Sequence, residues 1–111
     1  MRVYLCRVRI KETCMAKGYW VTFYRSITNH SALAEYASLA GPAIEARGGR
    51  FLARGTPAKA YEGGLHQRVV LIEFENVAKA VQTYESTAYQ TAVKVLEGAV
   101  EREVRIVQGV E

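Results

Sequence analysis

Two neighbouring segments, residues 48–55 and 68–74, constrain the fold of this chain more than any other part of it. The first reads Gly-Gly-Arg-Phe-Leu-Ala-Arg-Gly and the second Arg-Val-Val-Leu-Ile-Glu-Phe. The glycine pair is typical of a helix end, because glycine readily adopts the left-handed conformation that follows the last turn. A strand is expected in each segment, and the near-continuous apolar run of the second indicates a central position in a sheet.

The remaining elements follow from the spacing of apolar side chains. Alternation predicts strands over residues 19–25 and 103–108, and three- and four-residue spacing predicts helices over residues 30–47, 77–85 and 87–97. Each helix follows a residue whose side-chain oxygen can cap it: Asn29, Asn76 and Ser86. Gly41-Pro42 predicts a kink or break in the first helix, and residues 58–62 could continue as an irregular edge strand.

The predicted order is β-α-β-β-α-β. This is the split β-α-β, ferredoxin-like arrangement of the α+β class, in which an antiparallel sheet carries its helices on one face. With 111 residues, the chain is expected to hold one such domain over residues 15–111. Residues 1–14 are expected to be an N-terminal extension, either disordered or a short strand.

The distribution of charge argues against a nucleic-acid partner. Residues 1–14 hold four basic residues and one acidic one, so they carry +3 of the total net charge of +4. The rest of the chain is nearly neutral, whereas a phosphate backbone is bound by basic residues clustered on a folded face.

Other function classes are excluded on composition. The two cysteines, Cys6 and Cys14, lie in the same segment and no histidine cluster has ligand spacing, so we expect no metal and no cofactor. No stretch approaches the roughly 20 apolar residues of a membrane span. The expectation is a cytoplasmic protein with no membrane partner.

Strand alternation assigns side chains to the two faces of the sheet. The helix-covered face is expected to hold Val21, Phe23, Phe51, Ala53, Val70, Ile72, Val104 and Ile106. The other face would hold Trp20, Thr22, Tyr24, Leu52, Arg54, Val69, Leu71, Glu73, Arg105 and Val107. That second face is too apolar to be left in water, so we expect a homodimer in which two sheets stack and enclose an inter-sheet pocket. A one-residue shift of register would invert the assignment.

The chain resembles the DUF1330 family, small bacterial proteins of the dimeric α/β-barrel superfamily. The resemblance spans about residues 17–109, and its matching points are Gly18-Tyr19-Trp20, Glu35-Tyr36, Pro42, residues 48–55, Glu62-Gly63, Arg68-Val69-Val70, Ile72-Glu73-Phe74, Tyr84, Ser86 and Tyr89-Gln90. It departs from the family pattern at Asn29-His30, at Thr87-Ala88, and at Leu65, where relatives often carry tryptophan. The resemblance implies a ferredoxin-like fold and a homodimer, and it implies no particular activity. The wider superfamily includes cofactor-free monooxygenases, isomerases, haem-degrading enzymes and plain binding domains.

Three charged residues are candidates for a site. Glu73 interrupts an apolar strand, where a carboxylate is costly unless it is paired, so it is either a general acid or base or the partner of Arg54 or Arg68 in an ion pair. Arg54 and Arg68 could bind a ligand carboxylate through two parallel hydrogen bonds, or they could pair with Glu73.

Four aromatic residues are candidates for ligand contact. Trp20 and Tyr24 could line an aromatic pocket, or they could pack in the dimer interface. Tyr84 and Tyr89 could reach a ligand with their hydroxyl groups, or they could pack the helices against the sheet.

Two functions are compatible with these residues. In the first, a homodimer binds a small aromatic or carboxylated metabolite, either as a plain binding domain or as a cofactor-independent enzyme with Glu73 as its catalytic residue. In the second, the dimer is non-catalytic and its polar cluster only stabilises the barrel. The sequence leaves open whether the chain is an enzyme.

Overall fold

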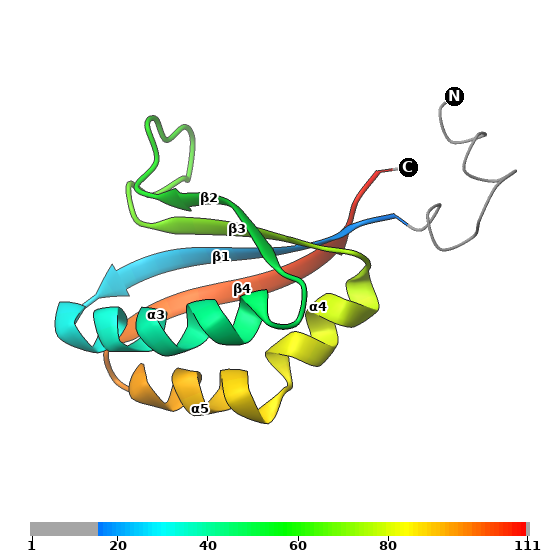
Figure 1. Ribbon diagram of the computed structural model, residues 1–111. Helices are drawn as coiled ribbons and strands as arrows, with labels where there is room; N and C mark the ends of the chain where they lie inside the picture. Colours follow the sequence, from blue (N-terminus) through cyan, green and yellow to red (C-terminus); the bar gives the residue numbers. More distant parts are fainter. Residues whose placement is uncertain (1–15, 111) are drawn as a thin grey trace, which may run out of the picture.

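The computed structural model describes residues 16–110 of the chain. The expected extension over residues 1–14 therefore lies outside the described residues. The elements in chain order are β1 (Gly18–Ile27), α3 (His30–Glu45), β2 (Arg50–Gly55), β3 (Val69–Phe74), α4 (Val77–Tyr84), α5 (Thr87–Val95) and β4 (Val100–Gln108). Figure 1 shows all three helices on the same side of the strands.

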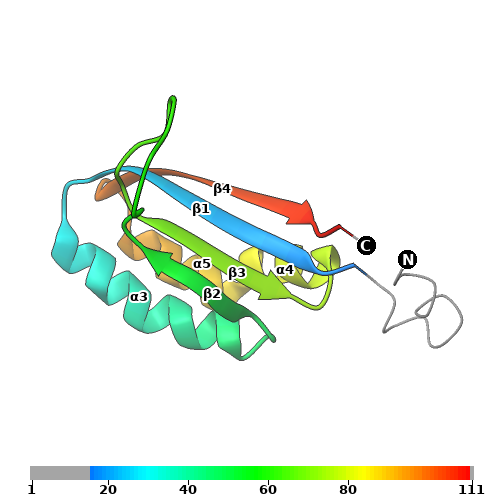
Figure 2. The same ribbon diagram turned by 90° about the horizontal axis from the view of Figure 1, so that it is seen from above.

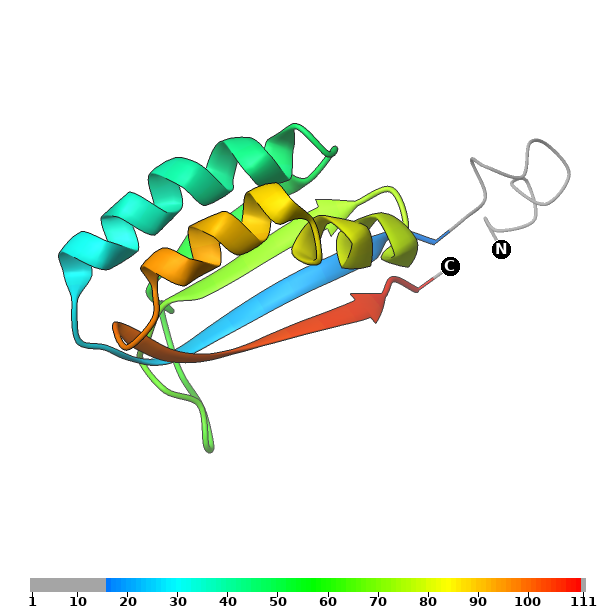
Figure 3. The same cartoon turned by 90° about the horizontal axis from the view of Figure 1, so that it is seen from below.

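The strands form one antiparallel sheet in the order β2-β3-β1-β4. Figure 2 shows β4 and β2 at its two edges, and the sheet does not close on itself. Figure 3, seen from the helix side, shows α3 and α5 side by side across it. The predicted ferredoxin-like α+β fold is confirmed.

Local sequence signals place the helix ends. The side chains of Asn29, Asn76 and Ser86 each accept a hydrogen bond from a backbone N–H in the first turn of α3, α4 and α5, respectively. Gly48 has φ +93° just beyond the end of α3, as predicted for a glycine that stops a helix. These signals need no tertiary contact, which is why they could be read from the sequence.

A kink or a break was predicted at Gly41-Pro42, and the break does not occur, because α3 runs as one helix from His30 to Glu45. Proline crowds the Cβ of the residue before it in a helical conformation, and that residue is Gly41, which has no Cβ. The predicted edge strand over residues 58–62 is also absent: these residues belong to an irregular loop that projects from the sheet on the side away from the helices (Figure 1).

The face assignment for β3 and β4 is confirmed, whereas the assignment for β1 is wrong. Trp20, Thr22 and Tyr24 are buried beneath the helices, and Phe23 lies on the open face with 40% of its surface exposed. Gly18, which has the same phase as Trp20, lies under α4, where an added Cβ would be 2.6 Å from the Asn76 carbonyl carbon. This close approach determines which side chains of β1 lie beneath the helices.

A second correction concerns β2. Phe51 packs against the core as expected, but the register shifts between Phe51 and Ala53. Such an extra residue turns the following side chains to the opposite faces. Arg54 therefore lies over the helix-covered face, opposite Val70 of β3, and Ala53 does not.

Candidate functional site

Four of the predicted site residues line one pocket between α3 and the sheet. Trp20, Tyr24, Arg54 and Arg68 are joined there by Tyr36 of α3 and Arg102 of β4. The cavity holds about 40 Å³, which is enough for about three water molecules at roughly 10–15 Å³ each. A carboxylate group fits a space of this size, with the remainder of a ligand toward the pocket mouth.

Arg102 is surrounded by tyrosine hydroxyl groups. Its Nη1 donates to the hydroxyl oxygens of Tyr24 at 3.2 Å and Tyr36 at 3.3 Å, and its Nη2 donates to that of Tyr89 at 3.2 Å. The guanidinium carbon also lies 5.0 Å from the centre of the Tyr36 ring. One side chain of the edge strand is thus bonded to β1, α3 and α5.

The hydroxyl groups of this cluster keep unused donors. Tyr36 and Tyr89 share a hydrogen bond, which uses the proton of only one of them. Each of the three tyrosine oxygens already accepts from Arg102, and a hydroxyl has one proton to donate. Within residues 16–110, the protons of Tyr24 and of one other tyrosine have no protein acceptor. An acceptor-rich ligand would complete the cluster.

The charge of the pocket is positive. Arg54, Arg68 and Arg102 all line it, no glutamate does, and none of the three forms an ion pair with a described residue. Arg102 is held by neutral partners alone. A partly buried cation in this situation favours an anion as its missing partner.

The protonation of the cluster follows from its surroundings. Burial raises the pKa of Tyr89 and Tyr24, so both hydroxyls stay protonated at neutral pH. Burial on its own would lower the pKa of the Arg102 guanidinium, but the tyrosine oxygens around it outweigh that effect and raise the pKa. The site therefore presents a fixed positive charge together with neutral donors.

Glu73 lies elsewhere. Its Oε1 forms an ion pair with Arg50 Nη2 at 3.1 Å, and its Oε2 accepts from the Tyr19 hydroxyl at 3.2 Å. Both partners share the open face with it, so the predicted pairing with Arg54 or Arg68 is replaced by one with Arg50. The structure does not bring Glu73 together with the pocket residues.

Tyr84 and Tyr89 pack around Trp20. The ring of Tyr89 meets that of Trp20 edge-on at 4.9 Å, and the ring of Tyr84 is tilted at 5.4 Å. Tyr89 is fully buried, and its hydroxyl belongs to the Arg102 cluster. Tyr84 lines a neighbouring groove beside β4 that shares Arg102 with the pocket, and it does not line the pocket itself.

Arg102 and Tyr36 were not among the predicted site residues, and Tyr36 was named only as a point of resemblance to the family. The sequence does indicate the position of Arg102, because strand alternation places it on the same face as Val104 and Ile106. The strand had been expected to begin at residue 103, whereas β4 begins at Val100. Extending the alternation to the true start of the strand places Arg102 under the helices.

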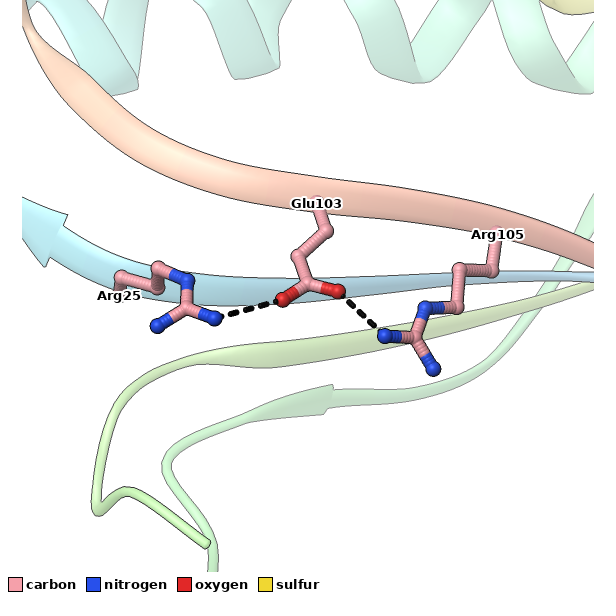
Figure 4. A network of polar contacts seen from close by, with 3 residues as sticks. All are labelled: Arg25, Glu103 and Arg105. Carbon is pink, nitrogen blue, oxygen red and sulfur yellow. Dashed lines mark hydrogen bonds and ion pairs between the residues drawn. The ribbon is translucent and has the colours of Figure 1, made fainter. Parts of the chain in front are cut away.

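A second hollow, of about 230 Å³, lies on the open face beneath the projecting loop. Glu103 forms ion pairs there with Arg105 at 2.7 Å and Arg25 at 3.1 Å, as Figure 4 shows. The hydrogen bond from Arg105, more than any other contact, lowers the pKa of the Glu103 carboxyl. Both arginines of this hollow are therefore paired with the same carboxylate, in contrast to the three arginines of the pocket.

Over residues 16–110, no histidine, cysteine or glutamate side chains gather in a group able to hold a metal ion. None of the helices in this range has the length and apolarity needed to cross a membrane.

The fold and the basic pocket define a small ferredoxin-like α+β protein with an internal polar cluster. Residues 17–110 match the family described as a domain of unknown function, DUF1330. The chain belongs to this family. None of the curated proteins with which it was compared matches its sequence.

Solved structures share the fold at low sequence identity. RPA0582 of Rhodopseudomonas palustris, a protein of unknown function, is 19% identical with a TM-score of 0.69, over 86% of this chain and 84% of that one. A dimeric ferredoxin-like protein of unknown function from Thermobifida fusca is 9% identical with a TM-score of 0.61, over 85% and 92%. An ethyl tert-butyl ether d (EthD) family protein from Bacillus halodurans is 10% identical with a TM-score of 0.61, over 85% and 99%.

Proposed function

We propose that this protein binds a small carboxylic acid in the pocket between α3 and the sheet. The observation that carries the proposal is the convergence of Arg54, Arg68 and Arg102 on a cavity without a glutamate. Arg102 supports it most directly, because its hydrogen-bonding partners, Tyr24, Tyr36 and Tyr89, are neutral.

The binding chemistry follows from the donors around the cavity. The ligand carboxylate accepts from the guanidinium of Arg102 and from the free hydroxyl proton of Tyr24, and such charge-assisted bonds are short and strong. Trp20, Phe51 and Ile44 supply apolar wall for the remainder of the molecule. Small aromatic and short aliphatic acids both fit this division between a polar end and an apolar wall.

The open face of the sheet supports assembly as a homodimer. Phe23, Leu52 and Val107 are large apolar side chains with 40%, 43% and 56% of their surface exposed, and Leu65 of the projecting loop is 50% exposed. Apolar side chains gathered on one face favour a partner over solvent. Two copies stacked through this face would leave each α3 pocket on the outer side of its own sheet.

A catalytic role would be one of anion stabilisation. Glu73 was predicted as the catalytic residue, but it lies on the open face and is paired with Arg50. The pocket side chains are donors, so they can stabilise a carboxylate or a developing enolate without a cofactor, and a proton acceptor would have to come from the ligand.

The second candidate function is a non-catalytic dimer in which the polar cluster is structural. It is favoured by the three hydrogen bonds through which Arg102 ties β4 to β1, α3 and α5. In this case Arg102 stabilises the packing of the helices, and no ligand is required.

A thermal-shift panel of small acids distinguishes the two candidates. An acid present at about 100 times its dissociation constant should add roughly 2.7 kcal/mol, which is a shift of several degrees for a domain of this size. The proposal expects the shift to vanish in Arg102→Met and to fall in Tyr24→Phe. Arg47→Ala, which removes the same charge from an exposed position outside the pocket, should keep it. Shifts that survive in Arg102→Met would refute the site, and a panel without any shift would favour the structural dimer.

A further inference from the structure

We propose that the ligand carries two acidic groups, so that the pocket is specific for dicarboxylates over monocarboxylates. This inference rests on the function proposed above and narrows its ligand class. It is drawn from the way in which the three arginines are distributed across the sheet.

Arg68 and Arg102 lie on either side of Tyr24. The backbone N–H of Tyr24 donates to the carbonyl oxygen of Arg68 at 3.0 Å, and Tyr24 pairs with Arg102 in the β1–β4 register. The three residues therefore form one row across the sheet, with Arg68 directly before β3, Tyr24 in β1 and Arg102 in β4. Neighbouring strands are about 4.8 Å apart, so the backbones of Arg68 and Arg102 are separated by about 10 Å.

Arg54 joins Arg68 on the β2 side of the pocket. The register shift in β2 turns its side chain over the helix-covered face, where it lies 4.3 Å above the centre of the Phe51 ring. It pairs with Val70, two residues beyond Arg68, so these two arginines occupy adjacent rows. Arg54 is exposed, whereas Arg68 and Arg102 are both half-buried. The pair formed by Arg54 and Arg68 therefore lies on the β2 side of the pocket, and Arg102 lies on the β4 side.

The pocket thus has two cationic ends. Arg102 with its tyrosine donors forms the end at β4, called the inner end here because of its three side-chain hydrogen bonds. The pair formed by Arg54 and Arg68 forms the end toward β2, called the outer end. One carboxylate at the inner end leaves the outer pair without an acidic partner among residues 16–110. A second carboxylate on the same molecule would supply it, and the surface between the two ends is apolar, with Val70 and Ile72 in its floor.

The same arrangement disfavours ammonium groups. No glutamate lines the pocket, so an amino group would meet three like charges and no carboxylate. The preferred ligand is a short dicarboxylate without an amine.

Calorimetric titration with matched pairs of acids tests the inference. Phthalate is compared with benzoate, and succinate with butyrate, on the full chain at low ionic strength. We expect each dicarboxylate to bind about tenfold more tightly than its partner, because the second carboxylate gains charge-assisted hydrogen bonds. Arg54→Ala and Arg68→Ala should each bring this ratio toward one, Arg102→Met should weaken both members of a pair alike, and Arg47→Ala should leave the ratio unchanged.

The outcomes separate this inference from the function on which it rests. If the two acids of each pair bind with equal affinity, and both lose binding in Arg102→Met, the dicarboxylate preference is overturned. The proposal of carboxylate binding then still holds. A ratio unchanged in both Arg54→Ala and Arg68→Ala would also overturn it. Absence of binding by all four acids would overturn both proposals.

Discussion

Arg102 of β4 and Tyr24 of β1 are cross-strand neighbours, and the guanidinium donates a 3.2 Å hydrogen bond to the tyrosine hydroxyl. Through further bonds to Tyr36 and Tyr89, the same guanidinium connects the sheet to α3 and α5. A charge with neutral partners at such a junction costs solvation without gaining an ion pair. This cation is therefore available to an anionic ligand.

The first prediction separates binding from stability at Arg102. Arg102→Met should change the free energy of unfolding by about 1 kcal/mol or less. The variant loses three hydrogen bonds, but it no longer bears the desolvation cost of a partly buried charge, and the two effects offset each other. It should nevertheless abolish carboxylate binding. Urea denaturation gives the stability, and a loss of more than about 3 kcal/mol would instead support a structural role for Arg102.

The second prediction concerns alkaline pH. Burial raises the pKa of Tyr24 and Tyr89 in the folded protein, so above pH 10 the unfolded chain loses phenolic protons that the folded chain keeps. Stability should be unaffected by these groups below about pH 10 and fall above it, by up to about 1.4 kcal/mol per pH unit for each tyrosine.

Tyr89→Phe provides the test of this slope. Denaturation at pH 8, 10 and 11 should show a shallower decline in the variant than in the wild type. Tyr61→Phe is the matched control, because Tyr61 is 74% exposed and its substitution should leave the slope unchanged. Equal slopes in Tyr89→Phe and the wild type would argue that the Tyr89 hydroxyl is not buried.

The third prediction tests the phase of β1. An added Cβ at Gly18 would lie 2.6 Å from the Asn76 carbonyl carbon and 2.7 Å from Val77 Cα, both backbone atoms. Gly18→Ala should therefore destabilise the protein by about 1–3 kcal/mol, since α4 must move. Gly63→Ala, whose Cβ would meet no atom within 4 Å, should be neutral or stabilising by less than about 1 kcal/mol. Similar stabilities for the two variants would contradict the inward phase of Gly18 and Trp20.

The fourth prediction concerns the ion pair on the open face. Arg50 is largely exposed, so its coupling to Glu73 should be worth about 1 kcal/mol or less in a double-mutant cycle of Glu73→Gln and Arg50→Gln. Glu73→Gln should leave carboxylate binding at its wild-type affinity. Loss of binding in a folded Glu73→Gln variant would place the ligand on the open face.

Local chemistry made much of the fold predictable. The caps at Asn29, Asn76 and Ser86 and the stop at Gly48 depend on a few adjacent backbone groups, and the sequence carries them directly. Central placement of β3 followed from its apolar run. The continuity of α3 through Pro42 was not predicted, although Gly41, the residue that accounts for it, is adjacent in the sequence.

The site was less predictable, because it depends on which way each strand faces. Residues 19–24 are apolar or aromatic on both faces, so hydrophobicity alone does not choose a phase, and the choice falls to the contact of Gly18 with α4. The register shift that turns Arg54 toward α3 leaves no mark in the sequence. Trp20, Tyr24, Arg54 and Arg68 were selected as candidates, yet their common pocket became visible only when these two tertiary features were known.

A crystal structure with a bound acid, benzoate or phthalate, tests the central claim most directly. The account predicts a carboxylate between α3 and the sheet, within hydrogen-bonding distance of Arg102 and the Tyr24 hydroxyl. An acid bound instead on the open face, beside Glu73 or in the hollow at Glu103, would contradict it.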